Sequence, residues 1–112
     1  MAKVKVVIAE RNGELVVEPA VAVLEKNGGG ANVDKLKIFN SADEDVVIHI
    51  YSDEPFGNAG SDKLFTIASK KASVLKPLNA AAVEAVYSYQ VLGIKTGRKG
   101  KGNSDPMLII DN

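Results

Sequence analysis

The sequence predicts an all-β domain, built as a Greek-key β-sandwich of seven to nine mostly antiparallel strands. Short runs rich in Val, Ile, Leu and aromatic residues recur between turn signals, which is typical of such domains. Within most runs apolar and polar residues alternate, so each strand has one face for a core and one for water. A chain of 112 residues, 46% of them hydrophobic, has the usual length for one domain spanning residues 1–112.

Nine segments carry the strand pattern, and the breaks between them have local causes. Asn12 and Gly13 suit a two-residue hairpin turn because both tolerate positive φ. Three glycines at 28–30 leave the backbone without side-chain restraint, and the stretch 55–60 cannot continue a ladder. The predicted strands are Lys3–Glu10, Glu14–Glu18, Ala20–Glu25, Leu36–Asn40, Asp45–Tyr51, Lys63–Ala68, Ala72–Lys76, Val86–Leu92 and Pro106–Asp111.

Alternation also predicts which side chains form the core. In VVIHIY the even positions share one face, and we expect that face to be buried, which leaves His49 on the other side. The expected inward residues are Val4, Val6, Ile8, Val46, Ile48, Ile50, Tyr87, Tyr89 and Val91.

One segment favours a helix. NAAAVEAV begins at Asn79 with a residue that caps helices well and continues with good helix formers. We therefore expect one short helix near residues 79–85.

Most of the chain, from residue 30 onward, resembles the cupredoxin family. The resemblance rests on the strand order, the tyrosine pair in VYSYQV, the long loop after it and the closing DPMLIID, and it covers residues 30–111. It implies a β-sandwich and, in copper-binding members, a histidine before a middle strand with a cysteine, a second histidine and usually a methionine around the last hairpin. Copper prefers such thiolate and imidazole ligands.

This sequence departs from that ligand pattern. It contains no cysteine, the loop LGIKTGRKGKGNSD has neither histidine nor methionine, and the turn NSADED offers acids in place of an imidazole. Met107 is interpreted as a core side chain. We therefore expect a cupredoxin-like domain without copper and without another cofactor.

Other chemistry has little support in the sequence. His49 is the only histidine and no nucleophile accompanies it, and the glycines of the last loop lack the spacing of a phosphate-binding P-loop. We expect no enzymatic activity. No apolar stretch has the length of a signal peptide or a membrane helix, so we expect a protein that is cytoplasmic at synthesis.

Two charged loops are the candidate partner-binding sites. Lys95, Arg98, Lys99 and Lys101 lie in the glycine-rich loop 95–103, and Asp43, Glu44 and Asp45 form an acidic turn. In the cupredoxin arrangement both loops lie at the same end, where they could pair within one molecule or between molecules. The sequence does not distinguish these arrangements.

Two functions remain open. One is a non-catalytic structural subunit of a homo-oligomer or larger assembly, such as a coat or virion, because many short strands need their edges covered. The other is a binding module whose basic loop holds an anionic partner, either nucleic acid or a phosphorylated ligand. The net charge of zero means that such binding must come from this local patch, and the loop lacks aromatic residues for stacking on bases.

Overall fold

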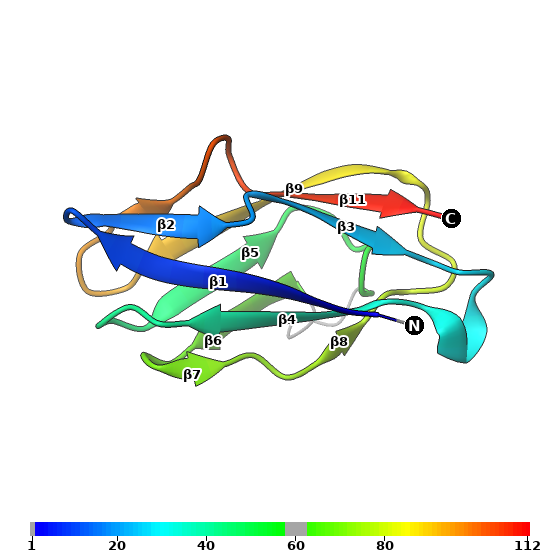
Figure 1. Ribbon diagram of the computed structural model, residues 1–112, viewed down its shortest axis with the longest axis horizontal. Helices are drawn as coiled ribbons and strands as arrows, with labels where there is room; N and C mark the ends of the chain where they lie inside the picture. Colours follow the sequence, from blue (N-terminus) through cyan, green and yellow to red (C-terminus); the bar gives the residue numbers. More distant parts are fainter. Residues whose placement is uncertain (1, 58–62) are drawn as a thin grey trace.

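The computed structural model describes residues 2–57 and 63–112, and its strands form two mixed sheets packed face to face (Figure 1). The first sheet has the order β2-β1-β4-β7, with β8 also paired to β4. The second has the order β3-β11-β9-β5-β6, with β10 also paired to β9. The strands are β1 Lys3–Arg11, β2 Glu14–Glu18, β3 Val21–Glu25, β4 Lys35–Asn40, β5 Val46–Ile50, β6 Leu64–Ile67, β7 Lys71–Ala72, β8 Lys76–Pro77, β9 Ala85–Gly93, β10 Lys99–Gly100 and β11 Met107–Asp111.

The core lies between the sheets and follows the alternation in the sequence. Val6, Ile8 and Ile48 are fully buried, and Val46, Ile50, Tyr89 and Val91 join the same cluster. Val4 and Tyr87 are partly buried at its margin. Most neighbouring strands are antiparallel, but β1 pairs in parallel with β4 and β11 pairs in parallel with β3. The predicted β-sandwich is confirmed.

Two details of the strand prediction need correction. The segment Ala72–Lys76 is not one strand, because Ser73 turns its side chain back onto the backbone N–H of Ile38 and splits it into β7 and β8. The glycine-rich loop 95–103 contains the short strand β10, which pairs with the end of β9. The stretch 58–62, which includes part of the predicted break at 55–60, lies outside the described residues.

The helix expected at residues 79–85 is also wrong. Asn79 does use its side chain as a cap, accepting a hydrogen bond from the N–H of Ala81 at 3.0 Å, and its carbonyl accepts one from Ala82 at 2.9 Å. A single turn results, because Ala82 is then buried in the core and β9 begins at Ala85. The tertiary contact of Ala82 thus outweighs the local helix propensity.

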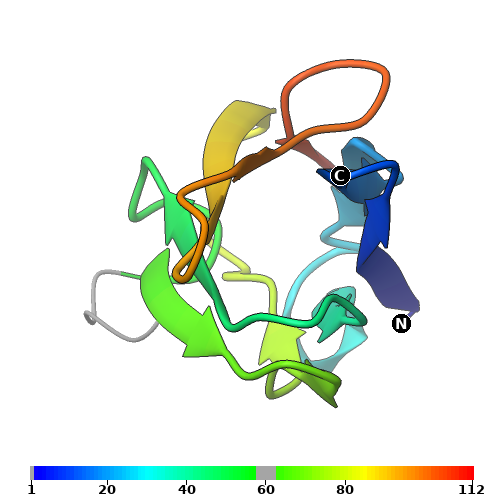
Figure 2. The ribbon, with the colours of Figure 1, turned by 90° about the vertical axis from the view of Figure 1, so that its left-hand side faces the viewer.

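The chain passes from the first sheet to the second between β2 and β3 (Figure 1). Pro19, which follows a cis peptide bond, lies at this corner. Residues before it pair with β1 and residues after it pair with β11. On the other side of β2, Lys101 exchanges two backbone hydrogen bonds of 3.3 Å with Leu15 and Val17. This seam connects the sheets along one side, as the end-on view shows (Figure 2). The described residues include no helix long and apolar enough to span a membrane.

Candidate functional site

The acidic turn before β5 and the loop after β9 meet at one end of the sandwich through Glu44. The Glu44 side chain is only 2% exposed. Its Oε1 accepts hydrogen bonds from the backbone N–H groups of Lys95 and Thr96 at 2.9 and 3.0 Å, and its Oε2 accepts one from the Thr96 hydroxyl at 2.7 Å. The carboxylate therefore fixes the turn that opens the basic loop.

Arg98 supplies the opposite charge. Its Nε and Nη2 donate to Oε2 of Glu44 at 3.2 and 2.5 Å, and its Nη1 donates to Oε2 of Glu10 and to the Gly13 carbonyl at 2.7 and 2.9 Å. One guanidinium thus joins the loop of the second sheet to the β1–β2 hairpin of the first. Hydrogen bonds from Arg98 and then from Thr96 outweigh burial and lower the pKa of Glu44 to about 2. The same bond to Glu44, followed by that to Glu10, raises the pKa of Arg98.

This end of the sandwich is where the cupredoxin resemblance places the copper ligands, and the residues found there do not fit copper. The carboxylate of Glu44 already accepts hydrogen bonds from five donors. The guanidinium of Arg98 is permanently cationic, so it cannot bind a metal ion. His49 lies within β5. Met107 begins β11 on the outer face of its sheet, opposite Val21, so its interpretation as a core side chain was wrong. Among the described residues, no group of three or more His, Cys, Asp or Glu side chains could hold a metal ion.

The remaining residues of the predicted site divide into two groups. Asp43 pairs with Lys70 at 3.1 Å, and Asp45 accepts a hydrogen bond from the N–H of Ser69, so both acids contact the β6–β7 turn. Lys95, Lys99 and Lys101 are exposed. Glu44 and Arg98 pair within one molecule, which resolves for this pair the question left open by the sequence. The prediction that the charged loops bind a partner stays a prediction.

Lys99 and Lys101 border a pocket of about 540 Å³ on the outer face of the second sheet. Ser88 and Gln90 project outward from β9, at alternate positions to the buried Tyr89 and Val91. Tyr51 follows β5, and its backbone N–H donates to the Ser88 carbonyl at 3.2 Å. Sequence reasoning missed this pocket, because Tyr51 and Gln90 come from segments far from the basic loop. The pocket is lined by Tyr51, Ser88, Tyr89, Gln90, Lys99, Gly100, Lys101, Asp105 and Pro106.

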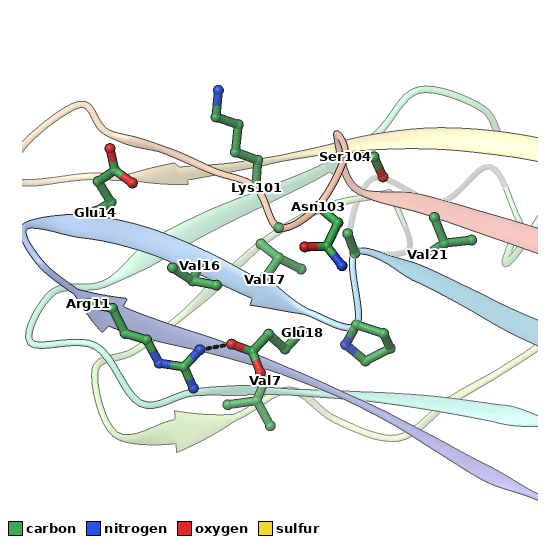
Figure 3. A pocket seen from close by; sticks show the side chains of 13 residues that line it. Val7, Arg11, Glu14, Val16, Val17, Glu18, Val21, Lys101, Asn103 and Ser104 are labelled. Carbon is green, nitrogen blue, oxygen red and sulfur yellow. Dashed lines mark ion pairs between the residues drawn. The ribbon is translucent and has the colours of Figure 1, made fainter.

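A second, shallower groove of about 1140 Å³ follows β2 and the corner at Pro19 (Figure 3). Its floor includes Val16 and Val7, and an ion pair between Arg11 and Glu18 lies beside it. Lys101 and Asn103 approach it from the last loop. Arg11 and Glu18 neutralise each other, and the charged residues Glu14 and Lys101 also line the groove, so it combines apolar and charged surface.

An apolar row crosses three neighbouring strands on the outer face of the second sheet. The strand register places Val23 opposite Ile109 and Ile109 opposite Val86, with Val21 opposite Met107 in the adjacent position. Val23 is 46% exposed and Val86 is 57% exposed. We call Val21, Val23, Met107, Ile109 and Val86 the apolar row. A signal for it exists in the sequence, since VAVLE and MLII lack the polar residue at every second position that a half-exposed strand normally has.

The apolar row ends at an open sheet edge. β3 pairs with β11 on one side, and no described strand pairs with its other side. The N–H of Met107 donates to Ala20 and that of Lys26 donates to Asp111, so even-numbered residues of this segment face β11. The backbone groups of Val21 and Val23 therefore face the open side, because neighbouring residues of a strand alternate in direction. The edge is covered at its far end, at Glu25. The N–H of Glu25 donates to the Asp34 carboxylate, and the carbonyl of Glu25 accepts from the N–H of Asp34.

Comparisons with known proteins show likeness at the level of structure. No protein-family model matches the chain, and no curated protein matches it. Similar solved structures include Fet3p, a multicopper oxidase that functions in iron import, with 16% identity and a TM-score of 0.51 over 99% of this chain. A second multicopper oxidase has 12% identity and a TM-score of 0.52 over 96% of the chain. A metallo-oxidase from Campylobacter jejuni has 11% identity and a TM-score of 0.51, again over 96%.

These likenesses establish the fold, which is cupredoxin-like. The chain spans 23%, 40% and 25% of the lengths of the three proteins, respectively, so it matches a part of each.

Proposed function

We propose that this protein acts without catalysis, as a structural subunit that associates with further copies of itself through the open edge of β3. The observation that carries the proposal is the continuity between that edge and the apolar row. An open edge offers unpaired backbone groups to another strand. Covering the apolar side chains beside that edge stabilises the association.

The backbone of β3 is compatible with a two-fold antiparallel pairing. If Val21 of one copy faces Val23 of another, each such pair exchanges two hydrogen bonds, and the symmetry axis passes between the two Ala22 residues. Only Val21 and Val23 have both backbone groups on the open side, since those of Glu25 are bonded to Asp34. This register also extends the apolar row into its copy, because the four valines then lie side by side on one face.

The edge itself carries no protection against such pairing. Natural edge strands are often blunted by charged side chains, proline or bulges. In β3 the first charged residue is Glu25, at its last position, and Pro19 precedes the strand by two residues. The edge of the first sheet at β2 differs, because the backbone of Lys101 bonds to that of β2. The described strands β6 and β7 also end their sheets, but β3 is the end strand that carries part of the apolar row.

The test is the solution mass of two matched valine-to-lysine variants. Val23→Lys places a charge in the middle of the apolar row, whereas Val74→Lys places one at another valine that is already 73% exposed. We expect Val74→Lys to keep the mass of the unmodified protein and Val23→Lys to become monomeric, with circular dichroism showing that both stay folded. A folded Val23→Lys variant with the mass of the unmodified protein would contradict association through β3.

The basic loop supports a second function, the binding of an anionic partner. Lys99 and Lys101 are exposed beside the pocket that Tyr51 also lines. The described residues include no ion pair to either lysine. Phosphate-driven binding weakens steeply as salt rises, whereas association through backbone and apolar contacts changes little. Titration with a short polyphosphate at two ionic strengths tests this function. Absence of binding at the lower ionic strength would contradict it.

A further inference from the structure

We propose that the pocket between Tyr51 and Lys101 is a binding site for a nucleotide unit, meaning a planar polar ring linked to a phosphate. The inference rests on the second of the two proposed functions and is independent of self-association. The basic loop itself has no aromatic residue, but the fold places Tyr51, which follows β5, in the same pocket as Lys99 and Lys101.

The aromatic wall is held in place. Tyr51 is 56% exposed, and His49 contacts it edge to face, with ring centroids 4.8 Å apart and ring planes at 74°. The two residues lie on the same face because they are two positions apart at the end of β5. Contact with the imidazole restricts the phenol ring, so less conformational entropy is lost when a second ring stacks on it. Base–aromatic stacking tolerates every base, because each base has a π-face.

The cationic wall stands across the floor from the ring. β9 lies between β5 and β10, since Gln90 pairs with His49 on one side and Leu92 pairs with Lys99 on the other. Neighbouring strands are about 4.8 Å apart, so the two walls rise from strands separated by roughly 10 Å. That gap accommodates a base next to Tyr51 and a phosphate next to the lysines. Pocket volumes of roughly 300–1,000 Å³ are usual for small ligands, and 540 Å³ lies within that range.

The floor and rim provide groups that can recognise the polar edge of a ring. Ser88 and the Gln90 amide can each donate and accept hydrogen bonds. Asp105 on the rim can accept from an exocyclic amine or a sugar hydroxyl, and it repels a phosphate placed on its own side of the pocket. The phosphate is thus directed toward Lys99 and Lys101. A bare anion would use the lysines alone, whereas a nucleotide uses the aromatic wall, the cationic wall and the polar groups of the floor and rim.

The test compares four probes by amide chemical-shift changes in the folded protein. Adenosine monophosphate has both parts of the ligand, ribose phosphate lacks the ring, and adenosine lacks the phosphate. We expect adenosine monophosphate to bind at least about tenfold more tightly than either, with shifts at Tyr51, Ser88, Gln90 and Lys99–Lys101. A short oligo(dA) strand distinguishes the source of the ligand. Tighter, strongly salt-dependent binding of the strand indicates single-stranded nucleic acid, and equal affinity indicates a free nucleotide.

Variants separate the parts of the site. Tyr51→Ala should weaken adenosine monophosphate at least about fivefold and leave ribose phosphate unchanged, because only stacking is removed. Lys99→Ser combined with Lys101→Ser should weaken both, and Lys71→Ser on the other sheet serves as the matched control. Equal binding of ribose phosphate and adenosine monophosphate would overturn the nucleotide site while anion binding stands. Absence of binding by any probe would overturn both.

Discussion

Glu44 and Arg98 are 54 positions apart in the sequence, and the guanidinium donates two hydrogen bonds to one oxygen of the carboxylate. The pair closes the end of a cupredoxin-like sandwich at which the acidic turn and the basic loop meet. It also couples the two sheets, because Arg98 reaches the β1–β2 hairpin as well. A charged network therefore holds these loops together.

Stability should fall in acid through Glu44. Its folded-state pKa is lowered from the usual 4.5 to about 2, so its contribution is fully present above about pH 4.5 and is lost as the pH falls toward 2. Denaturant unfolding at a series of pH values measures this effect. In Glu44→Gln the free energy of unfolding should be lower at neutral pH and should decline less between those two pH values. An unchanged decline would show that other acids are responsible.

Gly93 should not tolerate a side chain. A β-carbon there would lie 2.6 Å from Cδ of Glu44, closer than packed atoms approach. Gly93→Ala should therefore displace the carboxylate and destabilise the fold by about 1–3 kcal/mol, as overpacking usually does. Gly97→Ala is not a clean control, because Gly97 has positive φ, so the comparison is with Thr66→Ser at an exposed position of β6. A Gly93→Ala variant as stable as Thr66→Ser would contradict the tight contact.

Tyr89→Phe should stabilise the protein. The Tyr89 hydroxyl is buried in the core and has no hydrogen-bond partner among the described residues, and its burial raises the pKa of the phenol. An unsatisfied buried polar group typically costs about 1–3 kcal/mol, so removing the oxygen should raise the free energy of unfolding by roughly 1 kcal/mol. Urea unfolding of the two proteins measures the difference. A loss of stability would mean that the hydroxyl has a favourable partner in the folded state.

Packing at Ile48 should dominate core stability. Ile48 is fully buried in β5, between the cross-strand neighbours Val91 and Phe65. Ile48→Val should cost about 0.5–1.5 kcal/mol and Ile48→Ala about 2–5 kcal/mol, because the cavity grows with each group removed. Val47→Ala on the outer face of the same strand is the matched comparison and should cost less than Ile48→Ala. Equal costs at the two positions would contradict the assigned inner and outer faces.

Local sequence patterns were sufficient to predict the sandwich. They do not determine which distant segments of the chain meet. Strand alternation correctly placed Val46, Ile48 and Ile50 in the core, because the alternation of apolar and polar residues within a strand indicates which face is buried. The helix expected at 79–85 failed because burial of Ala82 outweighed propensity. The acid and the arginine of the closing pair were both named from the sequence, but their internal pairing was not, since it depends on how two loops meet. The position of Tyr51 beside Lys99 and Lys101 was not predicted for the same reason.

The most direct test of self-association is the solution mass of the unmodified protein by light scattering, over a range of concentrations and at about 0.05 and 0.5 M salt. This salt range changes the screening length several-fold, so it weakens charge-driven contacts but leaves strand pairing and apolar contacts largely intact. Association through β3 predicts a defined multimer that persists at both salt concentrations. A monomer at every concentration and both salt levels would contradict it.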